Sequence, residues 1–174
     1  IPIYATYLTA SQLGNYDYQI TIAWMLNPII LLALWEAVLR FGLNAEENEL
    51  KQVLSTVAII TSGTMFFSLV ILTLTYIQLY GLSLTTFLYI IMIMFIPIIQ
   101  ILGYMVRAVQ KTKVFAFSGV ISSGVNLIGV VVFVVFLHQG LNGLLMATII
   151  ANLFNSFSLF HGGSLQKYIS IRYF

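Results

Sequence analysis

Charged residues are confined to a few short segments of this sequence, and long uncharged stretches separate them. Residues 18–35, 52–106 and 114–166 contain no Asp, Glu, Lys or Arg. Over the whole chain 60% of the residues are hydrophobic and 7% are charged, whereas a soluble domain carries roughly 25% charged residues. A soluble fold of this size could not bury so much apolar side chain, so the mean hydropathy of +1.02 indicates an integral membrane protein.

The lengths of the uncharged stretches predict the number of membrane-spanning helices. About 20 apolar residues cross the hydrocarbon core, so the first stretch holds one span and each longer stretch holds two spans and a turn. Glycine and small polar residues mark these turns at 80–83 and 138–143. We therefore predict an all-α polytopic transmembrane bundle, a single helical lobe over residues 1–174 with five complete spans: 16–41, 49–80, 84–109, 113–138 and 142–162.

The basic residues predict the orientation of the spans. All Lys and Arg side chains lie within 40–51, within 107–113 or after residue 163. Because basic residues concentrate on the cytoplasmic side of membrane proteins, we expect loops 42–51 and 110–112 and the C-terminal tail to be cytoplasmic. The opening segment, IPIYATYLTA, is too short to span. We interpret it as the end of an earlier helix, and we expect the chain to be a fragment of a longer protein.

Polar side chains at membrane depth are the candidate functional residues. Four of them follow at helical spacing in the third predicted span: Gln100, Tyr104, Arg107 and Lys111. They share one face, and its polarity continues to the predicted cytoplasmic edge. Because buried amides and charges are costly in lipid, this face must contact a partner or a wet cavity. It is therefore the best candidate for a cavity wall.

Other polar residues admit two interpretations. Small polar residues favour close helix contacts and interhelical hydrogen bonds, which is the favoured reading of a Ser/Thr-rich stripe in the second span. For Asn126 in the fourth span, and for Asn152 in a fifth-span stripe that also holds Asn155, helix packing and ligand binding stay equally open. Gly119 and Gly124 are interpreted as close-packing positions.

Glu36 and Arg40 lie four residues apart near the predicted cytoplasmic end of the first span. This order favours an ion pair on one helix face, and an arginine near a helix end can extend to the lipid headgroups. One interpretation is a helix-end anchor with a local salt bridge. The other is a pair that faces the inner mouth of a cavity, where Glu36 orients Arg40 toward an anionic headgroup.

No combination of residues predicts enzyme chemistry. The two histidines, His138 and His161, have no carboxylate or second histidine at ligand spacing, and the chain contains no cysteine. A phosphate-binding loop is also lacking. We therefore predict that the chain is not an enzyme and has no catalytic residue, metal site or cofactor. The net charge of +2 gives no indication of nucleic-acid binding.

Three stretches carry a resemblance to a known family. They are PIYATYLTASQLGNYDYQI at 2–20, LWEAVLRFGLNA at 34–45, and residues 103–153, where a Lys-Thr-Lys loop leads into an Asn-containing helix, a Gly-x-x-Gly turn and an Ala-Thr-rich helix. Their order and spacing cover nearly the whole chain. The sequence resembles the O-antigen (Wzx-type) flippases, which are polysaccharide exporters of the multidrug/oligosaccharidyl-lipid/polysaccharide superfamily.

The resemblance implies a larger architecture and a substrate. Such flippases have two helical lobes and move undecaprenyl-pyrophosphate-linked oligosaccharides across the bacterial or archaeal cytoplasmic membrane by alternating access. The five spans would be the second to sixth helices of the first lobe. Implied partners are the lipid-linked oligosaccharide, membrane lipid, the second lobe, and the polymerase and glycosyltransferases of polysaccharide synthesis.

The resemblance also implies residue roles. Arg40 and Arg107 would bind the pyrophosphate, because a planar guanidinium matches phosphate oxygens. Gln100, Tyr104 and Asn126 would hydrogen-bond sugar hydroxyls.

Other classes of membrane protein remain as alternatives. One is a multidrug or peptidoglycan-precursor exporter of the same superfamily, although a cation-coupled drug exporter is expected to carry a buried acid. Another is a respiratory-complex subunit or an ABC permease, although loops 42–51 and 110–112 leave little room for a coupling helix. A structural membrane protein is the third.

Overall fold

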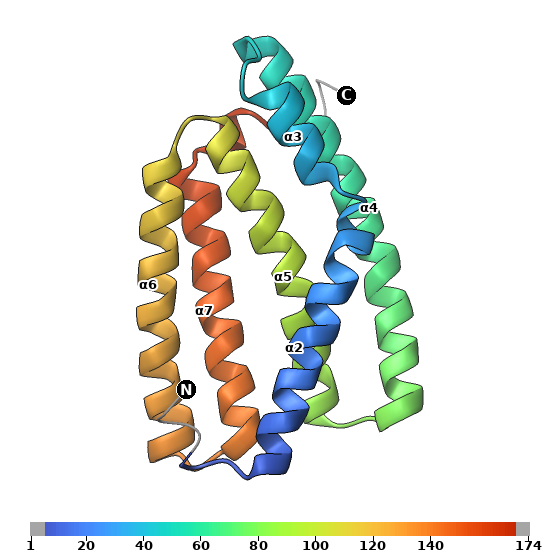
Figure 1. The fold of residues 1–174 in the computed structure, drawn as a ribbon, viewed down its shortest axis with the longest axis vertical. Coiled ribbons are helices and arrows are strands. Elements are labelled where there is room, and N and C mark those ends of the chain that lie inside the picture. Colours follow the sequence, from blue (N-terminus) through green and yellow to red (C-terminus); the bar gives the residue numbers. More distant parts are fainter. Residues whose placement is uncertain (1–5, 170–174) are drawn as a thin grey trace.

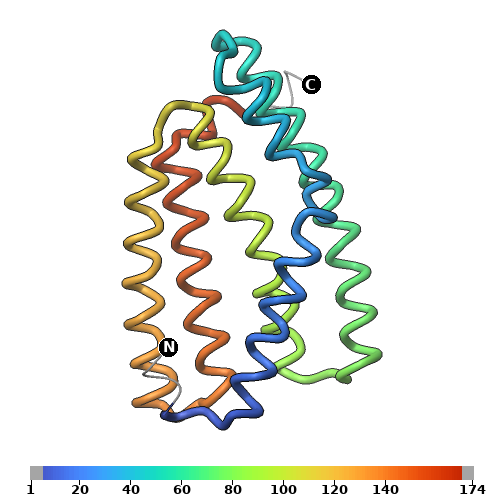
Figure 2. The backbone as a smooth tube through the Cα atoms, in the orientation of Figure 1, coloured from blue at the N-terminus to red at the C-terminus, as the bar shows by residue number. Residues whose placement is uncertain are grey.

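The computed structural model describes residues 6–169, which form a bundle of long helices (Figures 1 and 2). The helices are α2 (Ala10–Leu31), α3 (Leu34–Gly42), α4 (Glu47–Tyr80), α5 (Leu84–Ala108), α6 (Thr112–Val130) and α7 (Gly140–Gly162). A π-helical turn, Val131–Phe136, continues α6, and a 3-10 turn, Leu165–Lys167, follows α7. Helices are expected because backbone polar groups in lipid must be hydrogen-bonded within their own segment.

The predicted all-α polytopic fold is confirmed. Within the described residues, four helices are long and apolar enough to cross a membrane, and the bent pair α2–α3 would make a fifth span. Helices α4, α5 and α7 correspond to the second, third and fifth predicted spans, and they begin and end within two residues of the predicted limits. The first predicted span begins earlier than expected, at Ala10 of α2. Thr9 and Gln12 form a capping box there, in which each side chain accepts a hydrogen bond from the backbone N–H of the other residue.

The first predicted span is broken rather than continuous. Helices α2 and α3 meet at an angle of 56°. Leu32 and Ala33 connect them with φ values of 47° and 55°, in the left-handed region that is costly for residues with a Cβ. Pro28 also lacks a backbone N–H and so weakens the end of α2. The turn is nevertheless hydrogen-bonded, since the Ala33 N–H donates to the Pro28 carbonyl at 3.4 Å.

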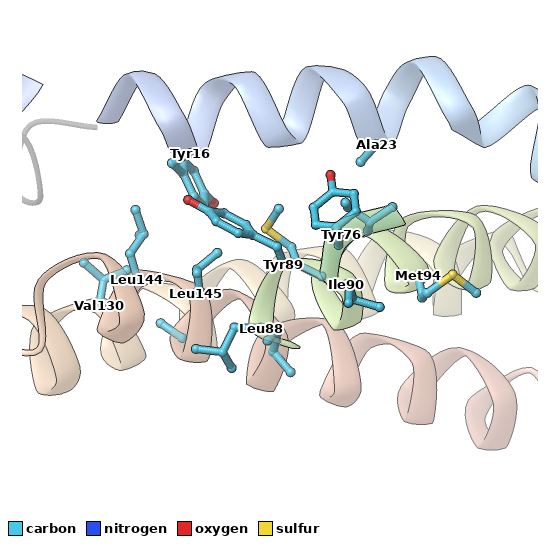
Figure 3. Close-up of a cluster of buried hydrophobic side chains, with 14 of the residues drawn as sticks. Tyr16, Ala23, Tyr76, Leu88, Tyr89, Ile90, Met94, Val130, Leu144 and Leu145 are labelled. Atoms are coloured by element: carbon cyan, nitrogen blue, oxygen red, sulfur yellow. The ribbon is translucent and has the colours of Figure 1, made fainter. Parts of the chain in front are cut away.

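Helix α5 is the centre of the bundle. It contacts α2, α3, α4, α6 and α7, while α6 and α7 pair along their length (Figure 1). Two apolar clusters surround α5, one toward each end. Toward the α4–α5 turn the cluster includes Ile90, Leu144 and Leu145 (Figure 3). Toward the α5–α6 turn it includes Val38, Leu54, Met105 and Leu159.

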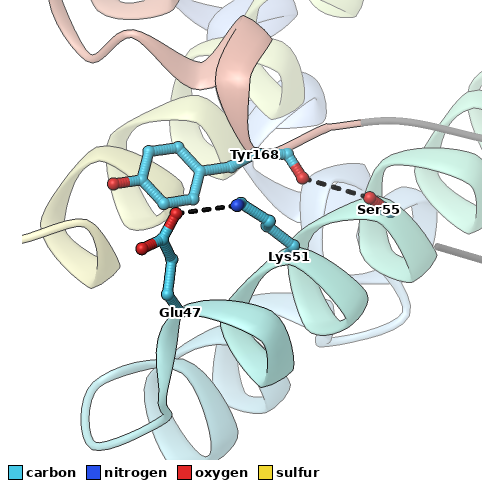
Figure 4. Close-up of polar contacts among 4 residues, drawn as sticks. All are labelled: Glu47, Lys51, Ser55 and Tyr168. Carbon is cyan, nitrogen blue, oxygen red and sulfur yellow. Dashed lines mark hydrogen bonds and ion pairs between the residues drawn. The ribbon is translucent and has the colours of Figure 1, made fainter. Parts of the chain in front are cut away.

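The fold brings the described basic residues to one end of the bundle. The α3–α4 loop, the α5–α6 loop and the C-terminal segment meet there (Figure 1), whereas Arg172 lies outside the described residues. The C-terminal segment is fixed to α4, because the Ser55 hydroxyl donates to the Tyr168 carbonyl at 3.2 Å (Figure 4). Next to it, Lys51 and Glu47 form an ion pair at 2.7 Å.

Gly119 and Gly124 are not close-packing positions within this chain. A Cβ added at either residue would meet no atom within 4 Å. Other glycines are close-packed, and Gly143 is one of them. There a Cβ would lie 2.8 Å from the backbone carbonyl oxygen of Phe133.

We predict opposite effects of alanine at two of these glycines. Gly143→Ala should lower the free energy of unfolding by about 1–3 kcal/mol, because a backbone carbonyl must move to admit the methyl group. Gly124→Ala should raise it by up to about 1 kcal/mol through helix propensity alone. Thermal unfolding in detergent micelles measures both. Equal effects of the two substitutions would contradict the helix packing described here.

Candidate functional site

A cavity of about 470 Å³ extends from the middle of the bundle toward the α5–α6 turn. Helices α2, α5, α6 and α7 supply its walls. The lining residues are Trp24, Ile96, Ile99, Gln100, Tyr104, Arg107, Phe115, Asn152 and Asn155. The α5 residues recur every three or four positions, so one face of that helix forms the longest wall.

Arg107 lies between two aromatic rings. Its guanidinium carbon is 4.6 Å from the centroid of Tyr104 and 4.2 Å from that of Phe115, distances at which a cation is attracted to the ring faces. The Phe115 ring is itself held against the backbone of α5, because a Cβ on Gly103 would lie 2.8 Å from its Cε2 atom. The sequence therefore needs glycine at residue 103 for the arginine to be enclosed from both sides.

The charge of Arg107 is not neutralised within the described residues. Their only ion pair joins Glu47 and Lys51. The Nε atom of Arg107 is buried and has no hydrogen-bond acceptor. An enclosed cation without a carboxylate favours an anionic ligand, because the ligand would supply both the missing charge and the missing acceptor.

Amide side chains line the cavity beside the arginine. Gln100 accepts a hydrogen bond from the Asn27 amide of α2, so its own N–H groups remain available to a ligand. The side-chain oxygens of Asn27 and Asn155 are buried without a donor. Unpaired buried carbonyls are costly, and a ligand with hydroxyl groups could pair with Asn155, which lies on the cavity wall.

Three of the predicted site residues come together in this cavity: Gln100, Tyr104 and Arg107. Lys111, the fourth member of the same predicted face, does not line it. Its ammonium donates to the Ser164 hydroxyl at 2.7 Å. The continuous polar face therefore ends at Arg107, and the last lysine fastens the α5–α6 turn to the segment after α7.

The other three candidates lie elsewhere. Glu36 and Arg40 are exposed on α3 and do not line the cavity. They form no ion pair either, so the predicted local salt bridge is wrong, and Arg40 instead lies 5.4 Å from the ring centroid of Phe41. An ion pair on the surface stabilises a protein little, because its Coulomb energy is small and both side chains lose conformational entropy when they pair. Asn126 is half-buried on α6 with an unpaired carbonyl oxygen, outside this cavity.

Sequence reasoning missed Trp24, Asn27 and Phe115. Trp24 and Asn27 lie three residues apart, so they belong to one face of α2. This spacing is the one sequence feature that could have indicated that both residues face the same neighbouring helix. Their partner Gln100 is distant in sequence, and nothing in the α2 segment indicates that α5 lies opposite. Asn155 belonged to the fifth-span stripe, which the sequence did not assign to a binding site in preference to helix packing.

Comparison of the chain with family models, curated proteins and solved structures found no match. Among residues 6–169, no three His, Cys, Asp or Glu side chains gather where they could hold a metal ion. The cavity must therefore be interpreted from its own side chains.

We predict that Asn27 and Gln100 are energetically coupled. Gln100→Leu leaves the Asn27 amide unpaired and should cost about 1–3 kcal/mol. The double variant Asn27→Leu/Gln100→Leu should cost less than the sum of the single variants, with a coupling of about 0.6–1.7 kcal/mol. Unfolding in bicelles gives the double-mutant cycle. Asn27→Leu/Asn155→Leu, whose members share no hydrogen bond, is the control. Additivity in both cycles would contradict the interhelical bond.

Proposed function

We propose that this chain is one lobe of a two-lobed membrane flippase that transports lipid-linked oligosaccharides with a pyrophosphate linkage. The observation that carries the proposal is Arg107, a cation enclosed by aromatic rings in a cavity where the described residues provide no carboxylate. A guanidinium forms paired, charge-assisted hydrogen bonds with phosphate oxygens. We therefore propose phosphate binding for Arg107 alone, because Arg40 lies outside the cavity.

The remaining wall suits the sugar part of such a substrate. Gln100, Asn152 and Asn155 present amides that can donate to or accept from hydroxyl groups. Trp24 is 58% exposed and offers a flat apolar surface to the carbon face of a sugar ring. Tyr104 contributes its ring to Arg107, and Asn126 has no role in this cavity.

Membrane lipid would accommodate the rest of the substrate. Helix α4 presents a broad apolar surface outside the bundle, with Phe66, Phe67 and Ile71 more than half exposed. Such a surface fits acyl chains or the second lobe. The lipid tail of the substrate would stay in the bilayer while its headgroup crosses through the cavity between the lobes, which opens alternately to each side.

The composition of the cavity separates this proposal from drug export. Its lining residues are one cation, three aromatic residues, two isoleucines and three amides, and none of them is Asp or Glu. A carrier for organic cations requires an acid that pairs with the drug or the coupling ion. An anionic cargo is therefore the better match.

The central test is the charge of Arg107 in the complete two-lobed protein. Arg107→Gln should weaken binding of undecaprenyl pyrophosphate in nanodiscs about tenfold or more, the loss expected for a charged hydrogen bond. It should also reduce surface polysaccharide in cells. Arg107→Lys should be intermediate, because lysine keeps the charge but cannot form the paired bonds.

Arg40→Gln is the matched control for that experiment. It removes the same charge from an exposed position on α3 outside the cavity, so binding and export should stay near the wild-type level. Wild-type binding and export by Arg107→Gln, with normal membrane insertion in both variants, would refute the assignment of Arg107 and with it the proposal.

The orientation in the membrane gives a further prediction. The chain contains no cysteine, so single cysteines can be introduced at the exposed positions Asn48, Gln110, Leu82 and Gln139. We expect a membrane-impermeant maleimide to label Leu82→Cys and Gln139→Cys on intact cells, and to label the other two only after permeabilisation. The reverse pattern would place the basic end outside.

A further inference from the structure

A second cavity lies at the opposite end of the α2–α5 interface from Arg107. Its volume is about 240 Å³, and it is lined by Asn15, Gln19, Tyr80, Ser83, Thr85, Thr86, Tyr89 and Leu141. These residues come from the first half of α2, the α4–α5 turn, the start of α5 and the start of α7. We propose that this cavity is a separate binding site for a neutral sugar ring.

The chemistry of the walls selects the class of ligand. Amides, hydroxyls and two phenols surround the space, and its lining residues carry no formal charge. Such groups both donate and accept hydrogen bonds, as a ligand with many hydroxyls requires, whereas an ionic ligand would find no opposite charge. A volume below the usual minimum of about 300 Å³ for drug-sized pockets fits one ring rather than a whole oligosaccharide.

Several wall residues are held in place before any ligand arrives. Gln19 is buried, and its carbonyl accepts the hydroxyl of Tyr76 on α4. This leaves the Gln19 N–H groups as donors. Thr85 donates to the Asn142 side chain of α7 at 2.8 Å. Fixed side chains lower the entropy lost on binding.

Tyr89 supplies the observation that points to a ligand. It is only 8% exposed, it lines the cavity, and its buried hydroxyl has no protein partner. Figure 3 shows the Tyr89 side chain extending from α5 toward Tyr16 of α2. The Tyr16 hydroxyl forms a hydrogen bond with the Thr148 hydroxyl at 3.2 Å. The Tyr16 phenol therefore has a protein partner, whereas the Tyr89 phenol has none. A buried unpaired hydroxyl is costly, and a sugar hydroxyl would remove that cost.

Apolar packing separates this cavity from the Arg107 cavity. Ala23 on α2 and Ile93 on α5 are completely buried, and Met92 is nearly so. They lie between the two sets of lining residues along both helices. The inference rests on the proposed function, since the proposed orientation places this cavity at the outer end, where the sugar of the transported molecule would leave the lobe.

The test uses the complete protein in nanodiscs and three neutral probes: the methyl glycosides of glucose, galactose and N-acetylglucosamine. Saturation-transfer NMR should detect binding of at least one probe to the wild type. Tyr89→Phe should raise its Kd about fivefold or more, the effect of one lost hydrogen bond. The melting temperature should not fall, because the deleted hydroxyl has no partner in the free protein.

Tyr18→Phe is the matched control, since it deletes a phenol hydroxyl from an exposed residue outside the cavity. If Tyr89→Phe lowers the melting temperature, the binding of the probe by Asn15→Leu becomes the deciding measurement. Asn15 lines the cavity but is exposed, so its replacement leaves the buried core unchanged. Absence of glycoside binding by the wild type would overturn the inference. Unchanged binding by the deciding variant would also overturn it. Arg107-dependent binding of undecaprenyl pyrophosphate would persist in either case, which separates this failure from failure of the proposed function.

Discussion

The packing of α5 against every other described helix is the constraint on which the rest of the structure depends. A helix in that position must be apolar around most of its circumference, and residues such as Met92, Ile93 and Val106 are almost completely buried. The polar residues that α5 does carry are confined to the face toward α2 and α7. Both cavities therefore open onto this one face, with Tyr89 in one and Arg107 in the other.

The surroundings of Arg107 explain how a cation can be held in the cavity without an ion pair. An ion pair would neutralise the guanidinium, and removing either partner would leave an uncompensated buried charge. Aromatic rings attract the cation with less energy, and they leave its N–H groups free for a ligand. Lys111 lies beyond the end of α5, immediately before α6, and its ammonium donates to the Ser164 hydroxyl. The helix face predicted to hold both basic residues therefore holds only Arg107.

Several of the buried unpaired polar groups lie along the same interface. Buried oxygens of Asn27, Tyr89 and Asn155 lack donors, and all three belong to the helices that line the cavities. Folding alone gains nothing from unpaired groups. Tyr89 and Asn155 line the two cavities, which is the pattern expected of ligand sites, whereas the exposed Thr75 hydroxyl bonds to its own helix, at the Ile71 carbonyl, at 2.8 Å.

The sequence by itself determined the helical spans, the turns near residues 80–83 and 138–143, and the face shared by Gln100, Tyr104 and Arg107. Hydropathy and helical periodicity act within one segment, so no knowledge of neighbouring helices is needed. Only the tertiary structure decided which helices face each other. It placed Phe115 over Arg107 and Asn27 against Gln100, it broke the first span at Leu32 and Ala33, and it left Glu36 and Arg40 unpaired on the surface. Such contacts join residues far apart in sequence, and their energies depend on burial that no single segment specifies.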